Sequence, residues 1–131
     1  MLSKGPSKKE LGDAAEDRAA AHLLRAGLTL LARNYRTPGR GGGEIDLVMR
    51  DQDGTLVFVE VRQRTSHRHG GAAASISAIK RQRIVFAARH YLARLPTWPP
   101  CRFDVVSIQG DSNQPGAEAT LEWLRAAFDA S

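Results

Sequence analysis

The sequence predicts one α/β domain in which a mixed β-sheet is flanked by helices. Two observations support this prediction. Helical and strand periodicities succeed one another in the order α-β-β-β-α-β-β, and a chain of 131 residues is long enough for one hydrophobic core. The hydrophobic fraction of 42% is ordinary for a globular protein, and no apolar run approaches the roughly 20 residues that cross a bilayer. We expect residues 1–8 to form a mobile basic arm and residues 9–131 to form the domain.

The first helix is expected between Lys9 and Ala26, because alanine and leucine recur there at helical spacing and Gly27 follows as a stop signal. Glu16 lies on this helix, and the pattern alone favours a solvent-facing residue beside neighbouring cations. Asp13 suits the start of the helix, either as an N-terminal cap or as a first-turn charge. On helical spacing alone, neither acid predicts a catalytic role.

The segment that follows, residues 28–35, is apolar and β-compatible, and it predicts the first strand. Residues 37–43 then include three consecutive glycines, which suit a hairpin connection or a close approach of the backbone to a ligand. Arg40 in this segment is a candidate contact for a phosphate group. A mobile connection without a binding role is the plainer interpretation.

Two strands of a hairpin are expected next, at Glu44–Met49 and Leu56–Arg62, with a polar turn at residues 51–54 that is typical of hairpins. Side chains alternate between the two faces of a strand, so Asp46 and Glu60 are carboxylates inside otherwise apolar strands. A charge in the interior of a sheet is costly unless it is paired or binds a metal ion.

Two interpretations of these carboxylates remain open. In the first, Asp46 and Glu60 form ion pairs with nearby arginines such as Arg62 or Arg50. In the second, the two carboxylates converge on a divalent cation. Carboxylate oxygens together with several waters are the ligands that Mg²⁺ accepts, and such ions activate water for attack on phosphodiesters.

A polar loop follows the second hairpin strand, at residues 63–71. Arg64 and Arg68 in this loop are candidate contacts for phosphate groups. The spacing of His67 and His69 resembles a metal-binding pair, but two histidines without further ligands are more typical of a plain surface loop.

The longest helix is expected between Ala72 and Leu95, with apolar residues on one face and cations on the other. The cations on the polar face are Lys80, Arg81, Arg83 and Arg89. A charge stripe of this kind is usually a solvated helix surface, although the first three of these residues are also candidate contacts for a nucleic acid backbone. Prolines at positions 96, 99 and 100 end the helix.

Two more strands complete the predicted sheet. Residues 102–108 alternate as a strand and carry Asp104, which we expect to pair with an arginine. After a loop rich in Gly, Pro, Asn and Ser, residues 119–124 are expected to form the final strand, followed by a short helix that ends at Phe128.

The net charge of +5 is distributed unevenly along the chain. Residues 33–102 contain thirteen Lys or Arg against five Asp or Glu, a net charge of +8, whereas the remainder after Arg102 has five acids and a single arginine. A basic centre favours a polyanionic partner, most simply nucleic acid, and a solvated basic surface is the alternative. The single cysteine, Cys101, excludes an internal disulfide and fits a reducing cytoplasm.

The hairpin carries a family resemblance. Its motifs, GEIDLV at Gly43–Val48 and LVFVEVR at Leu56–Arg62, resemble the core of the PD-(D/E)XK nuclease superfamily. More closely, they resemble the YraN family of small bacterial endonuclease-like proteins, which are similar to archaeal Holliday-junction resolvases. The resemblance extends over about residues 10–109, through the segments Gly12–Asp17, Ala32–Arg36, Ile79–Arg83, Ala87–Leu92 and Arg102–Val106.

The resemblance implies a restriction-endonuclease-like fold, in which Asp46, Glu60 and the backbone carbonyl of Val61 hold Mg²⁺ or Mn²⁺. It also implies that Glu16 is a third acid near the metal. Arg62 stands where the superfamily motif has a lysine, and an arginine stays protonated, so it is a poor general base. Either the metal suffices to activate water, or another residue such as Lys80 contributes, or the protein binds without cutting.

The function implied by the resemblance is a Mg²⁺-dependent DNA endonuclease acting on branched or damaged DNA. The alternative is a non-catalytic nucleic-acid-binding module that retains the nuclease fold. No RNA-recognition motif is readable, and the sequence does not separate DNA from RNA as the partner. A resolvase needs two active sites and hence a homodimer, and we expect no membrane association.

Overall fold

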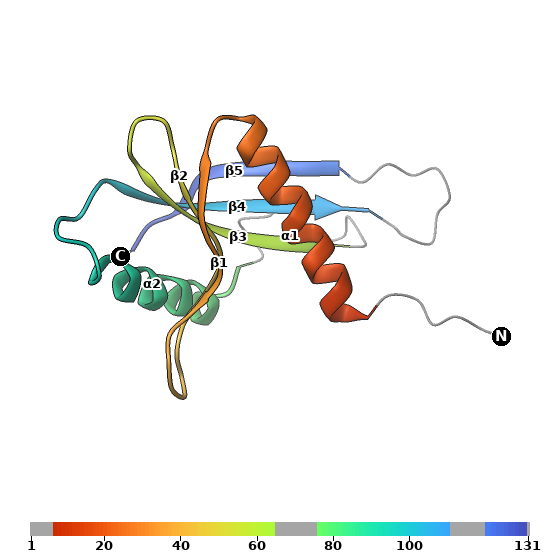
Figure 1. The fold of residues 1–131 in the computed structure, drawn as a ribbon. Coiled ribbons are helices and arrows are strands. Elements are labelled where there is room, and N and C mark those ends of the chain that lie inside the picture. The colour runs from red at the N-terminus through yellow and green to blue at the C-terminus, as the bar shows by residue number, and fades with distance from the viewer. Residues whose placement is uncertain (1–6, 65–75, 111–119, 131) are drawn as a thin grey trace.

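The computed structural model describes residues 7–64, 76–110 and 120–130, and their elements follow the predicted order α-β-β-β-α-β-β (Figure 1). The helices and strands are α1 at Lys8–Arg25, β1 at Thr29–Arg36, β2 at Glu44–Arg50, β3 at Leu56–Arg64, α2 at Ala78–Leu92, β4 at Cys101–Gln109 and β5 at Thr120–Phe128. The predicted fold class is therefore confirmed.

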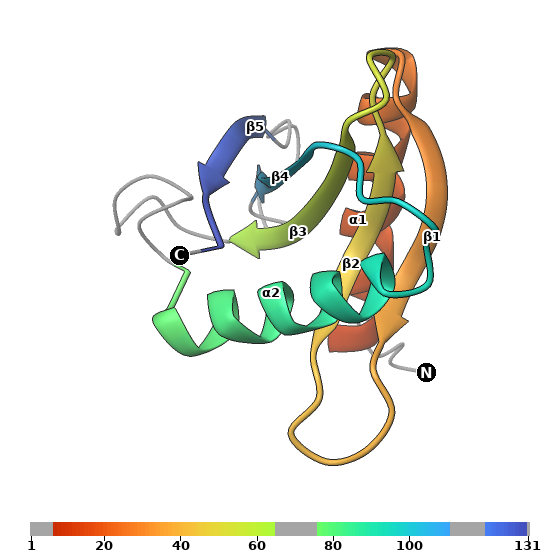
Figure 2. The same ribbon diagram turned by 90° about the vertical axis from the view of Figure 1, so that its left-hand side faces the viewer.

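The five strands form one mixed sheet in the order β1-β2-β3-β4-β5. Only β3 and β4 run parallel, and α2 makes the crossover between them, while the other neighbours are antiparallel. Helices α1 and α2 cover opposite faces of the sheet (Figure 2). This arrangement is the mixed sheet flanked by helices that the sequence predicts.

Each helix buries a stripe of small or aliphatic side chains against its face of the sheet. On α1, Ala15, Ala19 and Leu23 recur every four residues and pack against valines of β3, including Val57 and Val59. On the other face, the buried stripe of α2 packs around Phe58; the stripe consists of Ile84, Ala87, Ala88 and Leu92. Because most residues of β3 are covered on both sides, this strand forms the centre of the core.

The first helix begins earlier than the sequence predicted, and Asp13 is not its cap. Ser7 is the N-cap: its Oγ accepts a hydrogen bond from the backbone N of Glu10 at 3.1 Å, and the Glu10 carboxylate accepts one from the Ser7 backbone N at 3.3 Å. This reciprocal pair is a capping box, and it places Asp13 beyond the first turn. Residues 1–6 of the predicted arm lie outside the described residues, whereas Lys8 already belongs to α1.

The second helix is shorter than predicted within the described residues. Ser77 caps it by accepting a hydrogen bond from the backbone N of Lys80 at 3.1 Å, and Ala78 is its first residue. Residues 72–75 of the predicted range lie outside the part of the chain that the structure describes. Among the helices of that part, neither is long and apolar enough to span a membrane.

The predicted short helix near the C-terminus is wrong, because Thr120–Phe128 forms a single strand. This strand pairs with β4 from Gln109↔Thr120 to Phe103↔Phe128, with a register shift between Phe103 and Val105. Pairing with a buried neighbouring strand thus prevails over the helix-favouring composition of residues 124–127.

Asp104 holds this irregular end of the sheet together. Its buried carboxylate accepts hydrogen bonds from Arg102 at 3.1 Å, from the Trp123 indole at 2.9 Å and from the backbone N of Ala126 at 2.9 Å. Arg102 in turn contacts Asp51 at 2.8 Å. The predicted pairing of Asp104 with an arginine is confirmed, and the carboxylate is fully engaged in structural contacts.

Candidate active site

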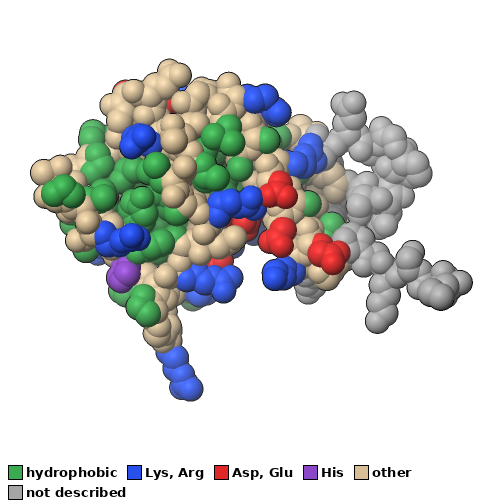
Figure 3. Space-filling view, in the orientation of Figure 1, with side chains coloured by type: hydrophobic (Ala, Val, Ile, Leu, Met, Phe, Trp, Pro, Cys, Tyr) green, Lys and Arg blue, Asp and Glu red, His purple; other side chains and the backbone are tan. Residues whose placement is uncertain are grey.

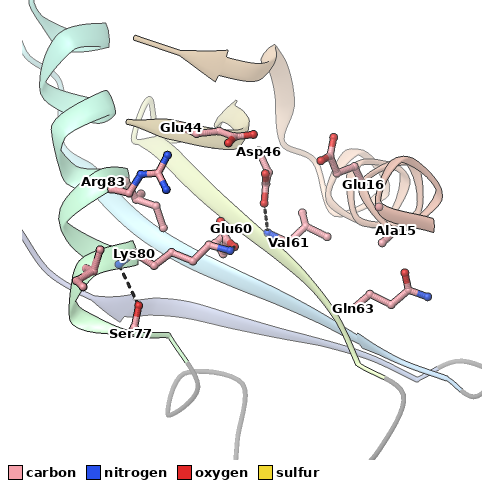
Figure 4. A pocket seen from close by; sticks show the side chains of 13 residues that line it. Ala15, Glu16, Glu44, Asp46, Glu60, Val61, Gln63, Ser77, Lys80 and Arg83 are labelled. Atoms are coloured by element: carbon pink, nitrogen blue, oxygen red, sulfur yellow. Dashed lines mark hydrogen bonds and ion pairs between the residues drawn. The ribbon is translucent and has the colours of Figure 1, made fainter. Parts of the chain in front are cut away.

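A cavity of about 470 Å³ opens between the two helices at the end of the sheet where β2 begins and β3 ends. It is lined by Gly12, Ala15, Glu16, Glu44, Asp46, Glu60, Val61, Gln63, Ser77, Ile79, Lys80, Arg83 and Ile84. We call this cavity the acidic cleft, because four carboxylate side chains line it (Figure 4).

The hairpin geometry brings Asp46 and Glu60 together. The paired register of β2 with β3 extends only to Leu47↔Val59, so the two acids lie just beyond the last pair, on neighbouring strands. There the Asp46 side chain takes over a role of the backbone, because its Oδ2 accepts a hydrogen bond from the backbone N of Val61 at 2.8 Å (Figure 4). This contact between a side chain and the backbone lies where the pairing of β2 with β3 ends.

The proximity of the two carboxylates changes their titration. Burial, and after it the neighbouring Glu60 charge, raise the pKa of Asp46 to about 7, although the hydrogen bond from Val61 and the charge of Lys80 act in the opposite direction. Glu60 is only 3% exposed. Two carboxylates in one poorly solvated place repel each other, and a cation placed between them relieves that repulsion.

Lys80 of α2 supplies one such cation. Its Nζ lies 2.5 Å from Glu60 Oε1. The lysine side chain is 48% exposed, whereas the carboxylate is buried. Ser77 fixes the start of α2 at the edge of the cleft, and so places Lys80 one turn into the helix, facing β3. Arg83 follows on the same side of the helix, and its Nε donates to the Gly42 carbonyl at 3.3 Å.

Close packing of β2 against α2 depends on Gly43. A Cβ at this position would overlap the carbonyl oxygen of Arg83 and would lie 2.7 Å from the backbone N of Ala87. Only glycine therefore allows the start of β2 to approach the helix that carries Lys80.

Glu16 reaches the cleft from α1, on the opposite side from Lys80. Burial raises the pKa of Glu16, and the charge of Asp46 raises it further, while Arg33 lowers it. Arg33 lies 3.5 Å from Glu16 and 2.7 Å from Asp17, so it is shared between two acids of α1. The structure thus brings Glu16 to the same cleft as Asp46 and Glu60.

Arg62 is absent from the described residues that line the cleft, although it occupies the lysine position of the sequence motif. Lys80, which contacts Glu60 in the cleft, comes from α2. Strand alternation could not identify this residue, because Lys80 meets Glu60 only through the packing of α2 on the sheet.

The cations predicted to contact nucleic acid are distributed over several elements. Lys80 and Arg83 line the acidic cleft, whereas Arg81 lines a separate groove on the other side of α2. Arg40 is exposed in the β1–β2 connection, which projects beyond the body of the protein (Figures 1 and 2). Arg64 is the last residue of β3.

Three other residues singled out in the sequence, Arg68, His67 and His69, lie outside the described residues. Conversely, Glu44 and Gln63 line the cleft but were not predicted there. The spacing of Glu44 from Asp46 is a signal that could have found the former, because residues two apart on a strand share a face. Glu44 also pairs with Arg36 at 3.3 Å.

Charge is not uniform over the surface of the molecule. Figure 3 shows acidic side chains in a row over α1, with Lys and Arg side chains beside them. The exposed acids of this helix are Glu10, Asp13 and Asp17. A polyanion is therefore attracted to the α2 side of the cleft, where Lys80 and Arg83 lie, more than to the outer face of α1.

The donor atoms of the cleft fit a hard divalent cation. Within the described residues, no three His, Cys, Asp or Glu side chains converge as a set of metal ligands. The protein would thus offer two carboxylates, Asp46 and Glu60, and a backbone carbonyl such as that of Val61, with waters or substrate oxygens as the remaining ligands. All-oxygen coordination with several positions outside the protein is what Mg²⁺ and Mn²⁺ accept.

Sequence comparisons relate the chain to one family. Residues 15–108 match the model of the uncharacterised protein family UPF0102. A UPF0102 protein of Polaromonas naphthalenivorans is 65% identical over 131 residues, covering 99% of this chain and 86% of that protein. A UPF0102 protein of Paracidovorax citrulli is 69% identical over 119 residues, covering 91% of this chain and 82% of that protein.

Among solved structures, the chain is similar to a repair endonuclease from Pyrococcus abyssi, with 19% identity and a TM-score of 0.41. The similarity covers 82% of this chain and 40% of the endonuclease, and a likeness at this level does not bear on activity. The match to the family model and the identities above 60% are decisive: the chain belongs to the UPF0102 family, which is the YraN family that its sequence resembles.

Proposed function

We propose that this protein is a Mg²⁺-dependent DNA endonuclease that hydrolyses phosphodiester bonds in branched or damaged DNA. The main support for the proposal is that Asp46 and Glu60 lie in one cleft. Lys80 of α2 lies in the same cleft and contacts Glu60. A protein that only bound DNA would gain little from two carboxylates that repel phosphate.

In this proposal Asp46, Glu60 and the Val61 carbonyl hold the metal ion. When bound, Mg²⁺ acts as a Lewis acid that activates water and neutralises charge on the phosphoryl oxygens. The raised pKa of Asp46 agrees with such a role, because a carboxylate held in unfavourable surroundings gains more from a nearby cation. Glu16 lies on the α1 side of the cleft, where it can hold or orient a water molecule.

Lys80 takes the part that the motif assigns to a lysine at position 62. Its ammonium group lies in contact with Glu60, at the place where a scissile phosphate would meet the carboxylates. From there it neutralises charge that develops on the phosphate oxygens, which is an electrostatic role that needs no loss of its proton. Arg62, which is absent from the described lining of the cleft, is then a residue beside the site.

Contacts with the DNA backbone come from the cations around the cleft. Arg83 lies inside it, Arg40 lies in the connection before β2, and Arg64 is the last residue of β3. Guanidinium groups bind phosphate oxygens in a bidentate manner, so arginines at these places suit a substrate that extends beyond the cleft. Two symmetric cuts in a branched substrate would require a homodimer.

A second candidate function is a nucleic-acid-binding module without catalysis. The arginine at position 62, in place of the motif lysine, favours this alternative. The two proposals differ over Lys80, which has a catalytic part only in the first.

The test is a cleavage assay with purified protein and labelled four-way junction, flap, duplex and single-stranded DNA, each with Mg²⁺, with Mn²⁺ and with EDTA. Asp46→Ala and Glu60→Ala serve as controls against a contaminating nuclease. We expect cleavage that depends on the metal and that both variants lose. Tight binding without cleavage of any substrate would establish the binding module instead.

A further inference from the structure

A second groove lies on the other side of α2, between this helix and the C-terminal end of β5. It has a volume of about 640 Å³ and is lined by Ala78, Arg81, Gln82, Val85, Phe86, Arg89, Ala127, Phe128, Asp129 and Ala130. Figures 1 and 2 both place the described end of the chain beside α2. None of these residues lines the acidic cleft, so the two cavities are distinct.

The helical wall of the groove has a regular pattern. The α2 residues that line it are spaced three, four, seven, eight and eleven positions from Ala78, which is one continuous stripe of a helix. Arg81 and Arg89 are exposed and eight residues apart, so their Cα atoms are separated by about 12 Å along the helix axis. Between them lies Phe86, whose side chain is 54% exposed.

The opposite wall is held in place by the core. Phe128 stacks on Phe103 with ring centroids 5.0 Å apart, and Ala127 packs against the buried cluster of Ile76 and Val105. This side of the groove is therefore an apolar surface that already exists before any ligand binds. Asp129 adds one acid to the rim, and it already has an interaction within the protein.

We propose that this groove binds an acidic peptide segment, in which two carboxylate side chains flank an aromatic or aliphatic residue. An extended chain advances roughly 3.3 Å per residue, so carboxylates about four positions apart match the spacing of Arg81 and Arg89. The residue between them packs on Phe86 and on the apolar surface of the opposite wall. The partner is a separate protein that carries such a segment.

The composition of the groove favours a peptide over nucleic acid. Six of its ten lining residues are Ala, Val or Phe, and its two arginines are separate points of charge. A nucleic acid strand needs a continuous basic track, whereas a peptide with discrete carboxylates and an apolar centre matches two cations on either side of an aromatic ring. This binding does not depend on the proposed nuclease activity, because Lys80 and Arg83 face the other cavity.

The test uses fluorescence anisotropy with the full chain and a fluorescein-labelled peptide, Gly-Ser-Asp-Leu-Phe-Leu-Asp-Ser-Gly, whose two aspartates are replaced by asparagine in a control peptide. We expect the acidic peptide to bind at least about tenfold more tightly than the control at low salt. Arg81→Glu, Arg89→Glu and Phe86→Ser should each weaken its binding about tenfold or more. Arg50→Glu has the same charge change at an exposed position at the end of β2, and should leave binding within about twofold.

The following outcomes would overturn the proposal. The first is equal binding of the two peptides, and the second is a loss with Arg50→Glu as large as that with Arg81→Glu. The third is tight binding of a labelled oligothymidylate that Phe86→Ser and Arg81→Glu abolish, which would assign the groove to nucleic acid. Sedimentation of the wild type and Phe86→Ser is run in parallel, because a dimer lost in the variant would make the groove a contact between copies of this chain. Thermal melts check that all variants are folded.

Discussion

Lys80 Nζ and Glu60 Oε1 lie 2.5 Å apart, and this contact joins α2 to the central strand β3 at the floor of the acidic cleft. The two residues are twenty positions apart in the sequence and come from different layers of the fold. The ion pair combines a half-exposed ammonium group with a carboxylate that is 3% exposed, so the lysine is accessible to a substrate while its partner is fixed. Lys80 is therefore the cation to which the proposed function gives a role in the cleft.

Replacement of Lys80 by alanine is expected to lower the rate of DNA cleavage about 10²–10³-fold, the usual cost of removing one preorganised charge from a transition state. Arg62→Ala is the matched comparison and should lower the rate less than tenfold, because its side chain is absent from the described lining of the cleft. Single-turnover cleavage rates of both variants show which of the two cations contributes to catalysis. An equal or larger loss in Arg62→Ala would return the catalytic role to the motif position.

The stability of the protein is expected to depend on pH through Asp46. Its pKa is raised from the ordinary value of 3.8 to about 7, so between these pH values the folded state holds a proton that the unfolded state releases. The stabilisation from this proton is complete below pH 3.8 and is lost as the pH rises to about 7. The wild type should therefore lose stability between pH 4 and pH 8, whereas Asp46→Asn, which has no carboxylate at this position, should not lose this contribution.

We expect Asp46→Asn to raise the free energy of unfolding by about 4 kcal/mol at pH 8 and to have little effect at pH 4. Asparagine keeps an oxygen that can accept the hydrogen bond from Val61, so the substitution removes charge with little change in shape. Urea unfolding of both proteins at several pH values measures the difference. A difference that is the same at pH 4 and pH 8 would show that Asp46 titrates normally.

Binding of Mg²⁺ should compete with the same proton. Asp46→Asn and Glu60→Gln are each expected to abolish Mg²⁺ binding while they preserve or tighten DNA binding, because a charge that repels phosphate is removed. In the wild type, a group with a pKa of about 7 is mostly protonated at pH 6, so the affinity for Mg²⁺ should be about tenfold weaker at pH 6 than at pH 8. Calorimetric titration with Mg²⁺ is the measurement, and unchanged affinity in both variants would exclude these two residues as ligands.

Much of the fold could be predicted because local sequence and tertiary structure agree. Strand alternation placed Asp46 and Glu60 inside a hairpin, and that hairpin is present with both acids at one end. The error lay at residues 124–127, whose leucine, arginine and alanines favour a helix in isolation. Their pairing with β4 depends on residues far away in the sequence, including Asp104, which binds the backbone N of Ala126.

The candidate site was harder to predict than the fold. The sequence grouped Lys80, Arg81 and Arg83 as one basic stripe, but successive helical residues are turned by about 100°, so the first and third line one cavity and the second lines another. The contact between Lys80 and Glu60 requires α2 to pack on a given face of the sheet at a given distance. Propensity and spacing contain no information about that distance.

Gly43 helps to set the distance between α2 and the sheet, and Gly43→Ala is expected to separate α2 from β2. The added Cβ would overlap the backbone of Arg83 and Ala87, and backbone atoms inside a helix cannot move aside as a side chain does. We expect a loss of about 2 kcal/mol in the free energy of unfolding and a fall in cleavage rate, because Lys80 moves with the helix. Gly12→Ala on α1 is the control, since a Cβ there meets no atom within 4 Å and alanine favours a helix. Urea unfolding of both variants gives the comparison, and a Gly43→Ala protein as stable as the wild type would show that α2 can shift without cost.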